Sequence, residues 1–287
     1  MQPIHEKVVA LFDGIMNEKN DIYDYCFAEN SERVLWFGKT YGIVGSHHDV
    51  DKFPRKSGPI QYWNRIQYFG DHVYVERHTA TFLDKGRNHP KSYGSSMEIL
   101  ACCELDDNGD IIRFEEFADP SMMGGGKRPV PAPQNPPNKV IRYDGENCGD
   151  AKYNDRLIQK AFDNIMLEED SIDLYSIEPV CKFAQMFATS FFTPNYLTIK
   201  PDKNGKIIQG AGGRAIYTNR RRYSGKGWSL ELHTVTLSTN PKKPTRRITG
   251  EVAAFAEVST DGKIKTFLEY ASPNDFKIAK ELCIAKM

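Results

Sequence analysis

The sequence predicts two α+β units in tandem, each with helices followed by a curved antiparallel sheet. Three observations lead to this prediction. The stretch from Glu98 to Pro120 recurs 153 positions later, from Glu251 to Pro273. A helical pattern near the start of the chain recurs 150 positions later, and a segment rich in glycine and proline separates the two halves.

The repeated stretch is identical at nine of its 23 positions, whereas average composition gives about one or two coincidences. The identities are Glu98/Glu251, Ala101/Ala254, Glu104/Glu257, Gly109/Gly262, Ile111/Ile264, Phe114/Phe267, Glu116/Glu269, Ala118/Ala271 and Pro120/Pro273. Each copy contains Asn-Gly or Asp-Gly, which supplies the positive φ values that a tight hairpin needs. We therefore expect the same hairpin in both halves.

The first expected element is a helix from His5 to about Phe27, because apolar residues recur there at spacings of three and four. A strand is expected at 34–37, followed by a turn and a short helix near Ser46. A long hairpin is expected from Ile60 to Leu83, and its second copy begins at Ala215. The copies match at Glu76/Glu231, His78/His233, Thr79/Thr234 and Thr81/Thr236.

Three consecutive glycines, Gly124–Gly126, and five prolines between Pro129 and Pro137 lie between the two halves. Proline cannot donate to a β-ladder, so this segment is expected to be an extended linker. The predicted division is residues 1–122, a linker at 123–150 and residues 151–287, with the boundary near 138.

Composition excludes several function classes. Lys plus Arg and Asp plus Glu both number 38, so no global field favours nucleic acid or a membrane surface. No apolar stretch is long enough to span a membrane. The six cysteines show no CxxC spacing, which gives no sign of a zinc site, and adjacent Cys102 and Cys103 are expected to be buried thiols. A soluble, cytoplasmic protein is expected, while Ala285-Lys286-Met287 is similar to a peroxisomal address.

Helices followed by such a sheet, ending in I-x-x-F-x-E-(F/Y)-x-x-P, resemble the NTF2-like superfamily in its SnoaL-like, ketosteroid isomerase-like branch. The resemblance covers about 115 residues of each half. It implies two cone-shaped domains and a pocket for a small apolar metabolite, with no cofactor and no metal. It also implies that the outer sheet faces pack together, as a pseudo-dimer within one chain or as a homodimer. The superfamily includes isomerases, cyclases, dehydratases, hydrolases and inert association domains.

The stretch from Val73 to Pro120 further resembles limonene epoxide hydrolase. The resemblance places Arg77 on that family's triad arginine, Thr79 on its water-activating aspartate and Glu116 on its proton-donating aspartate. A threonine without an adjacent base does not take a proton from water as a carboxylate does, so hydrolysis by the family mechanism is not expected. The same positions of the second half hold Leu232, Thr234 and Glu269.

Strand alternation places Arg77, Thr79 and Thr81 on one face, and the resemblance points this face into the pocket. The further inward side chains expected are Met97, Ile99, Ala101, Cys103, Phe114 and Glu116. Trp63 is a candidate substrate contact, although an aromatic residue in such a strand is more often part of a core. A register shift of one residue would exchange the two faces.

On this register His78 and His233 lie on the outer face, beside Glu76 and Glu231 and near Glu98 and Glu251 on the neighbouring strands. A buried polar network is the favoured interpretation, and catalysis by His78 is the second choice. The run His47-His48-Asp49 is interpreted as a solvated helix start rather than a metal site. The run Arg220–Arg222 is interpreted as a solvated edge or, less favoured, an anion grip.

The predicted function is general acid–base catalysis on a small, largely apolar metabolite. Glu116 is expected to move the proton, Arg77 to stabilise negative charge and Thr79 to orient substrate or water. Binding contacts are expected from Phe114, Met97, Ile99, Cys103 and Trp63. A second pocket near Glu269, Thr234 and Phe267 is expected to be vestigial or to bind only. The alternatives are a carrier of a hydrophobic ligand and an association module with filled cavities.

Overall fold

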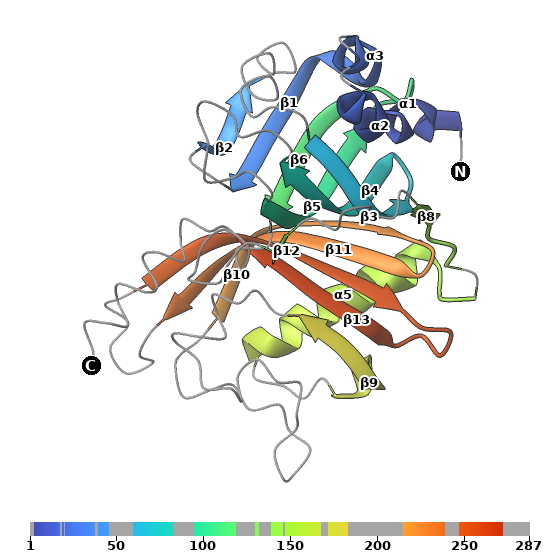
Figure 1. Ribbon diagram of the computed structural model, residues 1–287. Coiled ribbons are helices and arrows are strands. Elements are labelled where there is room, and N and C mark those ends of the chain that lie inside the picture. The colour runs from blue at the N-terminus through green and yellow to red at the C-terminus, as the bar shows by residue number, and fades with distance from the viewer. Residues whose placement is uncertain are drawn as a thin grey trace. The chain divides into compact units, whose positions relative to one another are not determined.

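The computed structural model describes residues 3–17, 19, 21–37, 40–45, 60–82, 95–118, 130–131, 139–145, 147–167, 172–182, 215–238 and 247–271. The chain forms two compact units, which divide between Tyr143 and Asp144 (Figure 1). None of the described helices is both long and apolar enough to cross a membrane.

The first unit begins with short helical segments: η1 (Pro3–His5), α1 (Glu6–Val9), α2 (Leu11–Met16) and α3 (Ile22–Cys26). The single helix expected from His5 to Phe27 is therefore broken. Asn17 ends α2, because its side-chain amide donates to the Asp13 carbonyl at 2.7 Å and competes with further helical hydrogen bonds.

The first sheet has the order β2-β1-β6-β5-β4-β3-β8, and β7 pairs with β5. Its strands are β1 (Phe27–Phe37), β2 (Thr40–Gly45), β3 (Ile60–Phe69), β4 (Val73–Phe82), β5 (Ser95–Leu105), β6 (Ile111–Ala118), β7 (Val130–Pro131) and β8 (Val140–Arg142). The two predicted hairpins are β3–β4 and β5–β6. Gly109 turns the second hairpin with φ +80°, and a Cβ atom there would meet the Ile4 carbonyl oxygen.

The segment expected to be a linker is not wholly irregular. Its β8 pairs in parallel with β3, and its β7 pairs with the start of β5. The first sheet therefore includes two short strands from this segment, Val130–Pro131 and Val140–Arg142. Proline is tolerated there because β7 is short and lies outside the main strand order.

The second unit contains α5 (Ala151–Leu167), η4 (Ile172–Leu174), β9 (Tyr175–Lys182), β10 (Ala215–Gly225), β11 (Trp228–Ser238), β12 (Arg247–Val258) and β13 (Ile264–Ala271). Its sheet has the order β10-β11-β12-β13-β9. The strands β3-β4-β5-β6-β1 follow the same order in the first unit, and both series end in a parallel pair. The fold is therefore duplicated.

In each unit the helices pack against one face of the sheet, which we call the inner face. In the second unit α5 packs on β10 and β11 (Figure 1). The inner core of the first unit joins helix residues such as Phe12 to Ile99, Cys103 and Phe114, and that of the second joins Phe162 to Phe267. The opposite face of each sheet is called the outer face below. The expected packing of the outer faces as a pseudo-dimer stays a prediction.

Candidate active site

A buried arginine and a buried glutamate form the centre of a polar network on the inner face of the first unit. Arg65 on β3 donates to Glu76 on β4 through Nε to Oε1 at 2.6 Å and through Nη2 to Oε2 at 3.1 Å. Its Nη1 also donates to Asp13 on α2. Since both oxygens of Glu76 are bound and the guanidinium is shared with a helix, the network fixes α2 to the sheet.

A β-bulge directs Arg65 inward. Trp63 pairs with Thr79 and Ile66 pairs with Arg77, so three steps along β3 match two along β4. Asn64 occupies the bulge with φ +51°, a left-handed conformation that asparagine adopts more readily than most residues. Without the bulge, alternation would place Arg65 on the same face as Trp63.

His78 lies beside this ion pair, at the next inward position of β4. Its ring makes edge contacts with Phe12 and Tyr62, at centroid distances of 4.5 and 4.7 Å. Its Nδ1 lies 3.3 Å from Glu76 Oε1, and both side chains are fully buried. Within the described residues, both ring nitrogens of His78 are buried and neither makes a hydrogen bond.

The surroundings of Glu76 keep it ionised. Burial alone would raise the pKa of Glu76, but contacts with His78 and Arg65 lower that pKa to about 2. Tyr74 donates its hydroxyl to Oε2, and Gln67 Nε2 donates to the same oxygen at 3.3 Å. Burial opposes the charge of Arg65 as well, yet Glu76 raises the pKa of this guanidinium above its usual value. Both partners are therefore charged near neutral pH.

A second pair of charged groups lies further across the inner face. Glu116 on β6 is buried, and its Oε2 lies 3.5 Å from Arg33 Nη2 on β1. The guanidinium of Arg33 lies over the Phe114 ring, 5.5 Å from its centroid. Glu76 and Glu116 both pair with Ala101 of β5, so two strand spacings, about 10 Å, separate their Cα atoms.

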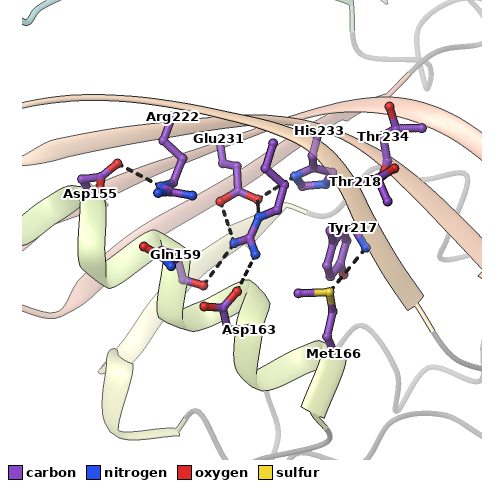
Figure 2. A network of polar contacts seen from close by, with 11 residues as sticks. Asp155, Gln159, Asp163, Met166, Tyr217, Thr218, Arg222, Glu231, His233 and Thr234 are labelled. Atoms are coloured by element: carbon purple, nitrogen blue, oxygen red, sulfur yellow. Dashed lines mark hydrogen bonds and ion pairs between the residues drawn. The ribbon is translucent and has the colours of Figure 1, made fainter.

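The second unit repeats the first network (Figure 2). Arg220 donates to Glu231 through Nε to Oε1 at 2.7 Å and Nη2 to Oε2 at 2.9 Å, and it also donates to Asp163 on α5. His233 Nδ1 lies 3.1 Å from Glu231 Oε1. Asn219 occupies the equivalent bulge with φ +52°. Burial lowers the pKa of His233, although the hydrogen bond to Glu231 opposes this shift.

Solved structures of single-unit proteins are similar to this chain. An NTF2-like protein of unknown function from Cytophaga hutchinsonii is 11% identical, with 43% of this chain and 96% of that chain covered and a TM-score of 0.34. An LEH-like epoxide hydrolase from M. tuberculosis is 13% identical, covering 42% of this chain and 86% of its own, with a TM-score of 0.31. A protein from Jannaschia sp. CCS1 named a SnoaL-like polyketide cyclase is 17% identical, covering 42% and 90%, with a TM-score of 0.33.

No protein-family model matches the chain, and no curated protein matches it in sequence. The decisive observation is the strand order shared by the two units, with helices packed on the inner face of each sheet. The two units therefore have the same α+β fold. The tandem α+β architecture predicted from the sequence is thereby confirmed.

The inward orientation predicted for the first three β4 candidates is wrong. Arg77 pairs with Leu100 and Thr79 pairs with Glu98, whereas the inward Glu76 pairs with Ala101. Because directly opposite residues share a face, Arg77, Thr79 and Thr81 belong to the outer face. Arg77 Nη2 lies 3.5 Å from Glu98 Oε1, and Thr81 accepts from Trp63 Nε1 at 2.9 Å. Trp63, for which a substrate contact was predicted, also lies on the outer face.

The predicted face of the two histidines is also wrong, in the opposite sense. His78 and His233 were expected on the outer face but lie on the inner face, in contact with Phe12 and Phe162. The expected partnership with Glu76 and Glu231 is present, whereas Glu98 and Glu251 lie on the other face. Thr234, a predicted pocket residue, is also outward, because its Oγ1 donates to Glu251 at 2.7 Å.

The remaining inward predictions agree with the register. Ile99, Cys103 and Phe114 belong to the inner core, and Glu116 follows Phe114 by two residues on the same face. Met97 pairs with Ala80 and shares this face by register, although its side chain lies outside the described part. In the second unit Phe267 is in the core, and Glu269 pairs with Ala254 on the inner face. Their substrate-binding roles stay predictions.

The arginines of both networks were missed by alternation, because the bulge reverses the face on which they lie. The run Arg220–Arg222 lies on the edge strand β10, as expected, but two of its side chains are bound: Arg220 binds Glu231, and Arg222 Nε donates to Asp155 at 3.0 Å. A signal was present in the repeat, where Tyr-x-Asn-Arg occurs at 62–65 and 217–220. Cys102 and Cys103 are buried free thiols, as expected.

No cluster of metal-ligating side chains occurs among the described residues. The predicted helix start at His47-His48-Asp49 and the C-terminal Ala285-Lys286-Met287 lie outside the described residues. The inner face brings a histidine, carboxylates and arginines together next to apolar and aromatic side chains. Such an arrangement can support proton transfer.

Proposed function

We propose that the first unit is an enzyme that moves protons on a small, largely apolar metabolite, with His78 as the general base. One arrangement carries the proposal: both ring nitrogens of His78 are buried without a hydrogen bond in the described structure, and Nδ1 lies 3.3 Å from Glu76 Oε1. Because an ionised carboxylate only accepts hydrogen bonds, a proton on Nδ1 would face Glu76. The lone pair of Nε2 then faces the interior.

The charged groups around His78 can stabilise a positive charge that develops on its ring during a reaction. Asp13, Arg65 and Glu76 carry a formal sum of −1, which becomes zero when His78 accepts a proton. Glu76 thus stabilises the imidazolium as it forms, while Arg65 and Asp13 hold Glu76 in place. These three residues position the base rather than contact the substrate.

Glu116 and Arg33 are the second functional group of this proposal. Arg33 takes the role that the sequence assigned to Arg77, stabilising negative charge that develops on a carbonyl or hydroxyl oxygen. Glu116 would exchange a proton with the substrate. It lies on the strand across Ala101 from the strand that carries Glu76 and His78. A base on β4 and an acid on β6 suit an isomerisation, a cyclisation or a dehydration, in which a proton leaves one atom and another atom is protonated.

The experiment compares wild type with His78→Asn in a metabolite extract, with mass spectrometry as the readout. A substrate consumed by wild type should be consumed about 10²- to 10⁴-fold more slowly by His78→Asn, because a positioned general base contributes that much. Glu116→Gln should also be slow. Thr79→Val, on the outer face, is the matched control and should keep its turnover.

Undiminished turnover by His78→Asn would refute the assignment of His78 as the base. A molecule that is retained by the wild-type protein but emerges unchanged would refute the enzymatic function. That outcome would favour the alternative of a carrier for a small hydrophobic ligand.

A further inference from the structure

The second unit contains a histidine whose environment repeats that of His78 in detail. His233 lies between Phe162 and Tyr217, at centroid distances of 4.6 and 4.7 Å, as His78 lies between Phe12 and Tyr62. Figure 2 shows its ring directed at Glu231, with Asp163 below on α5. Tyr217 N also donates to Met166 Sδ at 3.5 Å, which repeats the contact of Tyr62 with Met16.

The tautomer of His233 follows from its partner. Nδ1 lies 3.1 Å from Glu231 Oε1, and that carboxylate also accepts two hydrogen bonds from Arg220. Burial lowers the pKa of His233, so the neutral ring donates through Nδ1 to Glu231. The other polar group of the neutral ring is the lone pair on Nε2.

This lone pair is buried and has no hydrogen-bond partner in the described part of the chain. An unsatisfied buried acceptor is unfavourable, and in native proteins such atoms are uncommon without a reason such as a ligand or an ordered water. Glu231 orients the ring of His233 through Nδ1, and Arg220 and Asp163 hold Glu231 in place. Nε2 is therefore held in a fixed orientation.

The two units differ next to the glutamate. Tyr74, which donates to Glu76 in the first unit, corresponds to Ser229, and Cys103 opposite it corresponds to Ala256. Both exchanges replace a larger side chain by a smaller one on the inner face. Ser229 is buried, and its Oγ has no partner in the described structure. The second unit therefore retains the histidine but has smaller side chains beside Glu231.

We propose that the second unit holds its own ligand site, centred on His233 Nε2. Its ligand is a small neutral molecule that is mostly apolar and carries one hydroxyl or enol donor, because the free group is a neutral acceptor between aromatic rings. Phe162, Tyr217 and Phe267 supply the apolar contacts. The site does not depend on catalysis in the first unit.

Phenol and toluene are suitable probes, since they have the same ring and differ in the donor. The protein is labelled with ¹⁵N-histidine, and His78→Asn and His233→Asn assign the two signals. Phenol should shift the Nε2 signal of His233 in a saturable manner. Toluene should bind at least about tenfold more weakly, because it leaves the buried acceptor unpaired.

Substitution separates the contribution of the acceptor from that of the apolar contacts. His233→Leu should abolish the preference for phenol at this site while toluene still binds, and His78 in the same molecule should respond as in wild type. Methyl spectra of the second unit verify that the variant is folded. The wild-type titration does not depend on that variant.

A His233 signal that stays unchanged up to saturating phenol overturns the proposal, whether or not His78 responds. Equal binding of toluene and phenol would also overturn it, because the acceptor would then play no part. Loss of His78-dependent turnover with a normal His233 response would affect only the function of the first unit. The two proposals therefore fail separately.

Discussion

Arg65 and Glu76 are joined by two hydrogen bonds, of 2.6 and 3.1 Å, and their side chains are 1% and 0% exposed. Removing one partner leaves the other charge buried without its counterion. We predict that Arg65→Met lowers the free energy of unfolding by about 3–5 kcal/mol, measured by chemical denaturation.

Two further variants test the explanation for this loss. Arg77→Met removes an outer-face arginine whose Nη2 lies 3.5 Å from Glu98 Oε1 and should cost about 1 kcal/mol or less. The double variant Arg65→Met/Glu76→Leu should recover most of the stability, because no uncompensated charge remains. A loss in the double variant as large as in Arg65→Met would contradict the electrostatic explanation.

Acid sensitivity of the first unit should depend on Glu76. The pKa of Glu76 is lowered to about 2 from the usual value of 4.5, so the stability it provides is complete above about pH 4.5 and is lost as the pH falls toward 2. The difference of about 2.5 in pKa corresponds to about 3 kcal/mol. Urea unfolding between pH 2 and 6 should show this slope in wild type.

The slope should disappear in Glu76→Gln and be smaller in Tyr74→Phe, which removes one donor to the carboxylate. An unchanged slope in Glu76→Gln would mean that other groups cause the acid sensitivity. Since Tyr74 is replaced by Ser229 in the second unit, this graded effect belongs to the first unit alone.

The bulge at Asn64 should tolerate glycine but not valine. A left-handed φ of 51° suits glycine, whereas an ordinary L-residue loses about 1–2 kcal/mol there and a β-branched residue loses more. Asn64→Val should also misplace Arg65 and slow any His78-dependent turnover, while Asn64→Gly should preserve it. Equal behaviour of the two variants in unfolding and turnover would argue against the bulge as the positioning device.

The sequence was sufficient for the hairpins and the duplication, because Asn-Gly and Asp-Gly turns and the repeat are local signals. It was not sufficient for the faces. Alternation within β4 separates Glu76 from Arg77 but does not say which one faces the helices, and both faces carry apolar residues such as Val75 and Ala80. That choice depends on the pairing of Glu76 with Ala101, which is a tertiary property.

The ion pairs could not be predicted from the sequence for a related reason. Placing Arg65 required knowledge that Asn64 forms a bulge, and the resemblance to an epoxide hydrolase directed attention to Arg77 instead. The inward orientation of Glu116 was predicted correctly, because Phe114 on the same strand packs in the core. Its partner Arg33 was not predicted, because Arg33 lies on β1, a distant part of the chain.

The protonation of His233 can be tested by substitution, because each neighbour shifts the pKa of His233 in a defined direction. Burial lowers the pKa of His233, Glu231 raises it and Arg220 lowers it. In a ¹⁵N titration His233 should therefore become charged below the usual histidine value of 6.5, while the unfolded chain is protonated first. Stability of the second unit should accordingly fall as the pH decreases below about 6.5.

Substitutions should move this titration in opposite directions. Glu231→Gln should lower the pKa of His233 further, because the carboxylate that favours the imidazolium is lost, and Arg220→Met should raise it, because a nearby cation is lost. A shift in the same direction for both variants would show that structural rearrangement, rather than charge, controls the ring. Opposite shifts would establish Glu231 as the group that tunes this buried base.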